Sequence, residues 1–202
     1  MRNNTVDLMT DIAESGLDTL MDSLTNSEFI INVPVIGSFV KLYRAYNDYR
    51  AYRFCRRLKK IIDGAENLAY DRDEICKLYN NHHEYLFLHL LNVIDSIEEE
   101  EKIDIITNLF RAFLMKKIDK EEFRRFIHIT SSNFYYDLKW LDTFIDRIFA
   151  HESLELQGLI GTCLVAQDGE DRGGMNINNG GYYYIRTEAG QKFCEMAFHE
   201  HG

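Results

Sequence analysis

FIINVPVIGSFVKLYRAYNDYRAYRFCRRLKKII, from Phe29 to Ile62, is the stretch around which this chain of 202 residues is organised. Its first part, Phe29–Val40, carries no charge. The part Lys41–Lys60 then carries eight basic residues against one acid, Asp48, a local charge of +7. The whole chain carries −10, so all other residues together carry −17. This asymmetry predicts that the basic stretch meets an acidic surface, in this protein or in another.

The composition favours a helical protein with a packed core. Hydrophobic residues make up 46% of the chain, enough for a core, and the single proline is Pro34. The glycines cluster late, so most of the chain lacks the two residues that are costly inside helices. The uncharged run Phe29–Val40 is shorter than the roughly 20 residues of a membrane-spanning helix.

The cysteines and the start of the chain predict a cytoplasmic location. No two of the four cysteines, Cys55, Cys76, Cys163 and Cys194, form a C-x-x-C pair, which indicates reduced thiols. The opening MRNNTVDLMTDIAE lacks the basic and apolar regions of a signal peptide, so we expect no export. Peripheral contact with the inner membrane is the alternative location.

Apolar residues at three- and four-residue spacing predict a bundle of six or seven helices. Ahead of the basic stretch, Thr5–Leu24 reads as an acidic amphipathic helix. The basic helix is expected to begin near Ser38 and to close at Gly64. The further expected helices cover residues 65–80, 83–97, 99–115, 121–130 and 134–149, with a turn at 116–120 and caps offered by Ser131, Ser132 and Asn133.

Three arginines of the basic helix, Arg50, Arg53 and Arg57, fall on or beside its apolar stripe and not opposite it. Such a helix either lays its arginines along acidic neighbours or meets a partner through mixed tyrosine and arginine contacts. Within the protein, the expected neighbour is the acidic helix Thr5–Leu24. That internal arrangement, within one subunit or between subunits, is the preferred interpretation.

The pattern changes after Glu152. SLELQGLIG reads as a short helix, TCLVAQ as a strand, Asp168–Gly181 as a turn, and YYYIRT as a second strand. Thr187 is placed to cap a last helix. The expected fold is therefore mainly α, a helical bundle with a C-terminal winged-helix-like β-hairpin. Its expected parts are residues 1–64, 65–150 and 151–202, the last packed as one unit with the bundle.

Motifs for catalysis, metals and cofactors are missing from the sequence. His82, His83 and His89 lack the i, i+4 spacing of a zinc helix, and the residues before KKIDKEEF supply no oxygen ligands for calcium. The turn Asp168–Gly181 contains no phosphate-binding glycine motif, and no serine lies in G-x-S-x-G. We therefore expect no enzyme activity, no cofactor and no metal.

The back half resembles a known family. ITNLFRAFLMKKIDKEEFRRFIHITSSNFYYDLKWLD, then LELQGLI and YYYIRTEAGQKFCEMAF, are similar to the abortive-infection alpha family of bacterial anti-phage proteins. The resemblance covers about Ile103–Phe198, and no site residue can be carried across from it. It implies a bacterial protein, cytoplasmic or apposed to the membrane, that acts in phage defence.

These observations predict a non-enzymatic, phage-defence-type interaction protein, oligomeric or with a protein partner, that acts through residues 29–62. The contacted surface is a protein or an anionic membrane; nucleic acid is less favoured because the C-terminal module is acidic. The alternatives are a winged-helix DNA-binding regulator and an acidic immunity or decoy protein. The expected contact residues are basic or aromatic: Lys41, Arg44, Arg50, Arg53, Arg56, Arg57, Lys59, Lys60, Tyr43, Tyr46, Tyr49 and Tyr52.

Overall fold

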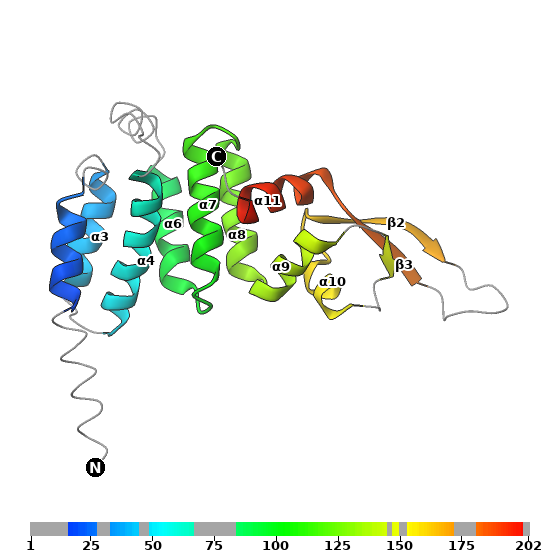
Figure 1. Cartoon of the computed structure of the whole chain (residues 1–202), viewed down its shortest axis with the longest axis horizontal. Helices are drawn as coiled ribbons and strands as arrows, with labels where there is room; N and C mark the ends of the chain where they lie inside the picture. The colour runs from blue at the N-terminus through cyan, green and yellow to red at the C-terminus, as the bar shows by residue number, and fades with distance from the viewer. Residues whose placement is uncertain are drawn as a thin grey trace, which may run out of the picture. The chain divides into compact units, whose positions relative to one another are not determined.

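A computed structural model describes residues 16–27, 33–44, 49–66, 84–144, 147–149, 153–171 and 181–199 (Figure 1). The fold is mainly helical with a C-terminal antiparallel β-hairpin, which confirms the fold class expected from the sequence. No helix in these ranges combines the length and the apolar character needed to cross a membrane.

The chain divides into two compact units, residues 1–98 and residues 99–202. The boundary between them, at Glu98 and Glu99, differs from the boundaries at residues 64 and 150 that the sequence suggested. Each unit is described by itself below.

The unit of residues 1–98 contains four helical segments among its described residues: residues 16–25, α3 (Pro34–Arg44), α4 (Tyr49–Glu66) and α6 (Glu84–Ser96). α6 packs against both α3 and α4. Its core consists of fully buried apolar side chains from all four segments, among them Leu17, Met21, Leu24, Ile36, Val40, Phe54, Leu58, Leu90 and Ile94. Burial of one such side chain stabilises the folded chain by roughly 1.5–3 kcal/mol.

The basic stretch forms two helices, not one that begins near Ser38. α3 starts at Pro34, because the fixed φ of proline suits the first position of a helix, where no N–H bond is needed. The prediction that Gly64 closes the basic helix is also wrong, since α4 continues through Gly64 to Glu66. Buried Ile61, Ile62 and Ala65 hold this last part of the helix against the core. Most of the helix expected at residues 65–80 lies outside the described residues, and its first two positions belong to α4.

The unit of residues 99–202 contains α7 (Lys102–Leu114), α8 (Lys120–Ser132), α9 (Tyr135–Thr143), β1 (Ile148–Phe149), α10 (Leu154–Leu159), β2 (Val165–Asp171), β3 (Gly181–Arg186) and α11 (Glu188–Phe198). Phenylalanine rings join α7, α8 and α11 in its core. The Phe113 and Phe123 rings stack with centroids 5.0 Å apart, and Phe126 meets Phe193 edge to face at 5.4 Å. Such pairs add about 0.5–1.5 kcal/mol beyond the burial of their area.

The turn between α7 and α8 has the position that the sequence predicts. Lys116 has a φ of 59°, and Asp119 caps α8 by accepting hydrogen bonds from the N–H groups of Glu121 and Glu122. Glu122 completes a capping box by accepting the N–H of Asp119 at 2.9 Å. The segment is a helix–helix turn made by local chemistry.

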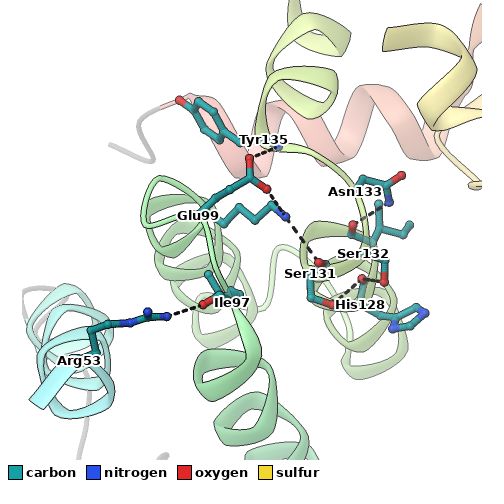
Figure 2. Close-up of polar contacts among 10 residues, drawn as sticks. Arg53, Ile97, Glu99, His128, Ser131, Ser132, Asn133 and Tyr135 are labelled. Atoms are coloured by element: carbon teal, nitrogen blue, oxygen red, sulfur yellow. Dashed lines mark hydrogen bonds and ion pairs between the residues drawn. The ribbon is translucent and has the colours of Figure 1, made fainter. Parts of the chain in front are cut away.

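The predicted caps of α9 belong to the preceding helix instead. The Ser131 and Ser132 hydroxyls both donate to the His128 carbonyl, and the Asn133 amide donates to the Ile129 carbonyl at 2.8 Å (Figure 2). Short polar side chains can hydrogen-bond back to carbonyls three or four residues earlier, and here they close the end of α8. α9 is also shorter than expected and ends at Thr143.

The end of α9 is held from the hairpin. The Arg186 guanidinium donates to the carbonyl oxygens of Leu141, at 3.1 Å, and Asp142, at 3.4 Å. Phe144 turns into extended backbone, is buried, and stacks on Trp140 with ring centroids 5.1 Å apart. Hydrophobic periodicity places Phe144 inside a longer helix and Arg186 in a distant strand, so it predicts neither interaction.

The sheet has the strand order β1-β3-β2, and both pairs are antiparallel. Tyr184 of β3 lies opposite Ile148 on one side and Gln167 on the other. β2 continues to Asp171, into the part expected to be a turn, across a bulge between Gln167 and Glu170. Gly169 makes that bulge possible because its φ is +123°, a conformation that favours glycine.

The start of α11 is a tight joint built from Thr187 and Gly190. The Thr187 hydroxyl accepts the N–H of Gly190 at 2.9 Å and donates to the Cys163 carbonyl at 2.7 Å, which confirms Thr187 as the cap. A Cβ on Gly190 would lie 2.2 Å from the Leu164 carbonyl oxygen. The spacing T-x-x-G therefore lets α11 approach the backbone ahead of β2.

Candidate functional site

The arginine flank of α4, defined as Arg50, Arg53 and Arg57, contacts the C-terminal end of α6. Arg57 donates to the Ile94 carbonyl at 3.0 Å, and Arg53 donates to the Ile97 carbonyl at 3.0 Å (Figure 2). The last carbonyls of a helix have no partner within the helix, and the last turn of α6 contains no basic residue. α4 therefore supplies the donors and the positive charge that the end of α6 needs.

Burial differs along this flank. The Arg57 residue is only 2% exposed, whereas the Arg50 side chain is 71% exposed. Arg50 forms an ion pair with Asp95 of α6, whose side chain is 20% exposed. An exposed pair of this kind contributes about 0–1 kcal/mol, so the buried Arg57 contact is the stronger link.

The sequence predicts that these arginines meet acidic neighbours within the protein, with the segment Thr5–Leu24 as the expected one. Their described contacts are with α6, through Asp95 and two carbonyls. That segment lies partly outside the described residues. The sequence could not identify α6, because the hydrophobic pattern of α6 says nothing about which helix caps its end.

A second set of residues on α4 faces outward. Tyr49, Arg56 and Lys60 lie within about 40° of one another around the helix, at about 100° per residue, and all three are exposed. We call these three residues the exposed stripe. The opposite side of α4 is apolar and buried, with Phe54 and Leu58 at 1% exposure. One helix thus combines a core face, a flank that caps α6 and an outward cationic stripe.

The remaining predicted contact residues are distributed around these surfaces. Lys41 is exposed on α3, and Lys59 forms an ion pair with Asp63 at 2.7 Å. Tyr52 is half-buried, and its ring lies 3.1 Å from where a Cβ on Gly16 would stand. Tyr46 lies outside the described residues, as do the side chains of two residues within α3, Tyr43 and Arg44.

The second unit contains a polar joint that the sequence did not reveal. Glu99 accepts the N–H of Tyr135 at 3.0 Å and pairs with the Lys102 ammonium at 2.7 Å (Figure 2). Lys102, only 5% exposed, also lies 3.5 Å from the Ser131 carbonyl. Phe134, the N-cap residue of α9, makes no side-chain cap, so Glu99 takes that role from 36 residues away. No local signal predicts such a distant cap.

Asp137 and Glu155 lie beside this joint, where α9 meets α10. A Cβ on Gly158 would stand 2.2 Å from Asp137 Oδ2, so the Asp137 carboxylate occupies the space above that glycine. Burial raises the pKa of Asp137, the charges of Glu155 and Glu99 raise it further, and Lys102 opposes them. Glu155 instead accepts a hydrogen bond from the Ser153 hydroxyl at 2.6 Å, which lowers its pKa.

Arg147 fastens the bulge of β2. It pairs with the Asp168 carboxylate at 3.1 Å, donates to the Asp168 carbonyl at 2.7 Å, and lies 3.9 Å from the centre of the Tyr183 ring. A Cβ on Gly169 would be 2.6 Å from the guanidinium. Arg147 therefore holds the bulge of β2 against Tyr183 of β3.

Two of the described cysteines are poorly suited to nucleophilic catalysis. Burial raises the pKa of the Cys55 thiol to about 12 and, as the leading cause, that of Cys194 to about 11, so both are poor nucleophiles at neutral pH. Within the described part of the chain, no group of three or more histidine, cysteine or carboxylate side chains is placed to hold a metal ion. His82 and His83 lie outside that part.

No protein-family model, curated protein or solved structure matches this chain.

Proposed function

We propose that this chain is a non-enzymatic interaction protein that contacts an acidic partner surface through residues 29–62. The observation that carries the proposal is that two sets of residues on α4 have different roles. Three arginines hold the helix on α6, while Tyr49, Arg56 and Lys60 point outward from the same helix. A cationic stripe on a helix that is itself anchored loses little conformational freedom on binding.

The residue types of the stripe favour a protein partner. Tyrosine and arginine are enriched at protein interfaces, where each combines a broad contact area with directional polar groups. Arg56 and Lys60 are one helical turn apart, so two neighbouring carboxylates on a partner could pair with both. An anionic membrane is the other source of negative charge, and each basic residue near such a surface contributes about 1 kcal/mol.

The test compares wild type with the double reversal Arg56→Glu/Lys60→Glu. Binding is measured at low salt to polyglutamate, by fluorescence anisotropy, and to vesicles of phosphatidylglycerol or phosphatidylcholine, by flotation. We expect wild type to bind polyglutamate and the double variant to bind at least tenfold more weakly. Flotation with phosphatidylglycerol vesicles alone would move the proposal to a membrane surface.

The control is Lys117→Glu/Arg125→Glu, which makes the same change in net charge at exposed positions of the other unit. Thermal unfolding shows whether each variant keeps its fold. If wild type bound neither polyglutamate nor anionic vesicles, the proposal would be overturned. It would equally fail if both double variants lost binding to the same extent.

A role in phage defence is the second part of the proposal, and the resemblance of residues 103–198 to the abortive-infection alpha family supports it. Bacteria that produce the chain are expected to show reduced phage plating, and the double variant Arg56→Glu/Lys60→Glu is expected to remove the protection. Equal plating on cells with and without the chain, over a broad phage panel, would contradict this role.

A further inference from the structure

The junction of α9 and α10 exposes apolar side chains next to carboxylates. Tyr136 is 71% exposed and Leu154 is 79% exposed. Asp137 and Glu155, each next to one of them in the chain, are partly exposed. We call these four residues the acidic patch. Exposed apolar side chains of this size can supply contact area to a partner that covers them.

Packing of α9 on α10 brings Asp137 close to α10, the helix that carries Leu154 and Glu155. The Asp137 carboxylate lies over Gly158, and Leu154 is one helical turn before Gly158 on the same side of α10. Ser153 caps α10 by accepting the N–H of Leu156 at 3.2 Å, and its hydroxyl also donates to Glu155. The patch is therefore built on two capped helices and not on a loop tip.

The charges of this region are unbalanced. Asp137 feels the negative charges of Glu155 and Glu99, and the cation that opposes them, Lys102, is buried and paired with Glu99. Burial first, and then these neighbouring charges, disfavour the ionised form of Asp137. A cationic partner placed over Asp137 and Glu155 would relieve the repulsion, so the electrostatics favour a partner that brings positive charge.

We infer that the acidic patch binds the exposed stripe of α4 in a second copy of this chain. This inference rests on the proposed function and identifies its partner. Arg56 and Lys60, separated by one helical turn, complement Asp137 and Glu155, while the rings of Tyr49 and Tyr136 and the Leu154 side chain supply apolar contact. The two surfaces differ, so each copy keeps one of each available and the assembly is head to tail.

The experiment measures solution mass by light scattering over a range of protein concentrations, at low and at high salt. We expect wild type to associate at low salt and to dissociate at high salt, because screening weakens contacts between surface charges. Glu155→Lys and Arg56→Glu/Lys60→Glu are each expected to weaken association at least tenfold. Tyr136→Ala, which leaves every charge in place, is expected to weaken it several-fold. The controls are Glu195→Lys and Tyr182→Ala, at exposed positions of α11 and β3.

A charge exchange makes the test specific. Mixing Glu155→Lys with Arg56→Glu/Lys60→Glu brings together one intact stripe and one intact patch, so the mixture is expected to associate more strongly than either variant alone. A wild type that stays monomeric at every concentration at low salt would overturn the inference, as would association that the patch variants leave unchanged.

The two proposals fail in different ways. A monomeric wild type that still binds polyglutamate through Arg56 and Lys60 would retain the proposed function and remove only the second copy as partner. If wild type bound no anionic probe but associated through the patch, the stripe would not be the contact surface, and both the inference and the proposed function would fall.

Discussion

In the unit of residues 1–98, two arginines of α4 donate to carbonyl oxygens at the end of α6. In the unit of residues 99–202, Glu99 accepts the first N–H of α9, and Lys102 lies 3.5 Å from the Ser131 carbonyl near the end of α8. Both devices use a charged side chain from another element to satisfy a helix end. They differ in that guanidinium groups keep their charge at all accessible pH values, whereas a carboxylate can lose its charge. The contact made by Glu99 is therefore one that acid can weaken.

The largest expected effect comes from Arg57→Ala. Loss of this buried donor leaves the Ile94 carbonyl without it and opens space in the core, so we expect the unit of residues 1–98 to lose about 3 kcal/mol of stability. Hydrogen exchange of α4 and α6 measures the loss. The matched control is Arg56→Ala, which removes an exposed arginine one residue away and should change stability by less than about 0.5 kcal/mol. Equal effects of the two variants would show that the flank and the stripe are not distinct.

Glu99→Ala breaks the corresponding joint in the second unit. It removes the cap of α9 and the ion-pair partner of buried Lys102, for an expected loss of about 2 kcal/mol. Glu99→Gln keeps an acceptor for the Tyr135 N–H and is expected to lose about half as much. Hydrogen exchange at the start of α9 is the readout. If Glu99→Ala left the exchange of Tyr135 and its neighbours unchanged, the distant cap would be refuted.

Acidification is expected to change the stability of the second unit by less than the two substitutions above. Burial opposes the charge of Glu99, but hydrogen bonds from Lys102 and from the Tyr135 N–H outweigh it and lower the pKa below its usual 4.5. The contribution of Glu99 to stability is therefore complete above about pH 4.5 and is lost as the pH falls through the lowered pKa. Asp137 has a pKa raised above 3.8, so its protonation gives the opposite sign, a gain in stability as the pH falls through that raised value.

Carbon-13 NMR of the side-chain carboxyl groups follows both titrations, with Glu99→Gln and Asp137→Asn to assign them. Denaturation midpoints at several pH values then give the sign of each contribution. A Glu99 carboxyl that titrated above its usual range would contradict the hydrogen-bonded arrangement.

Arg50→Ala is expected to have the smallest effect. Its ion pair with Asp95 is mostly exposed, and such pairs contribute about 0–1 kcal/mol, so we expect a change within about 0.5 kcal/mol that disappears in high salt. Chemical denaturation at two salt concentrations measures it. A loss as large as that of Arg57→Ala would mean that surface charge, and not buried hydrogen bonding, holds α4 on α6.

Local chemistry made several elements predictable. Thr187 caps α11, and the turn between α7 and α8 lies where KKIDKEEF placed it, with Asp119 and Glu122 as a capping box. These features depend on residues three or four apart, and the same is true of the hydrophobic spacing that predicted most helices. The β-hairpin followed from two β-branched and aromatic stretches around a glycine-rich turn.

Where two local outcomes compete, the sequence pattern predicted the wrong one. Ser131, Ser132 and Asn133 have the right chemistry both to start a helix and to close one, and they close α8. The choice depends on Glu99, which already satisfies the start of α9 from a distant position. Gly64 was read as a helix end because glycine is unfavourable in helices, yet the apolar side chains around it hold α4 in place.

The sequence by itself determined the helical class of the chain, the C-terminal hairpin, and the concentration of positive charge between Lys41 and Lys60, because all three follow from composition and short-range spacing. Only the tertiary structure decided which of those charges serve the fold. Arg53 and Arg57 turn inward because α6 presents unsatisfied carbonyls to one flank of α4, and Arg56 and Lys60 remain outward because they lie on the opposite side from the buried stripe. Helical periodicity places residues around a helix, but the neighbour that each face meets depends on packing between distant segments.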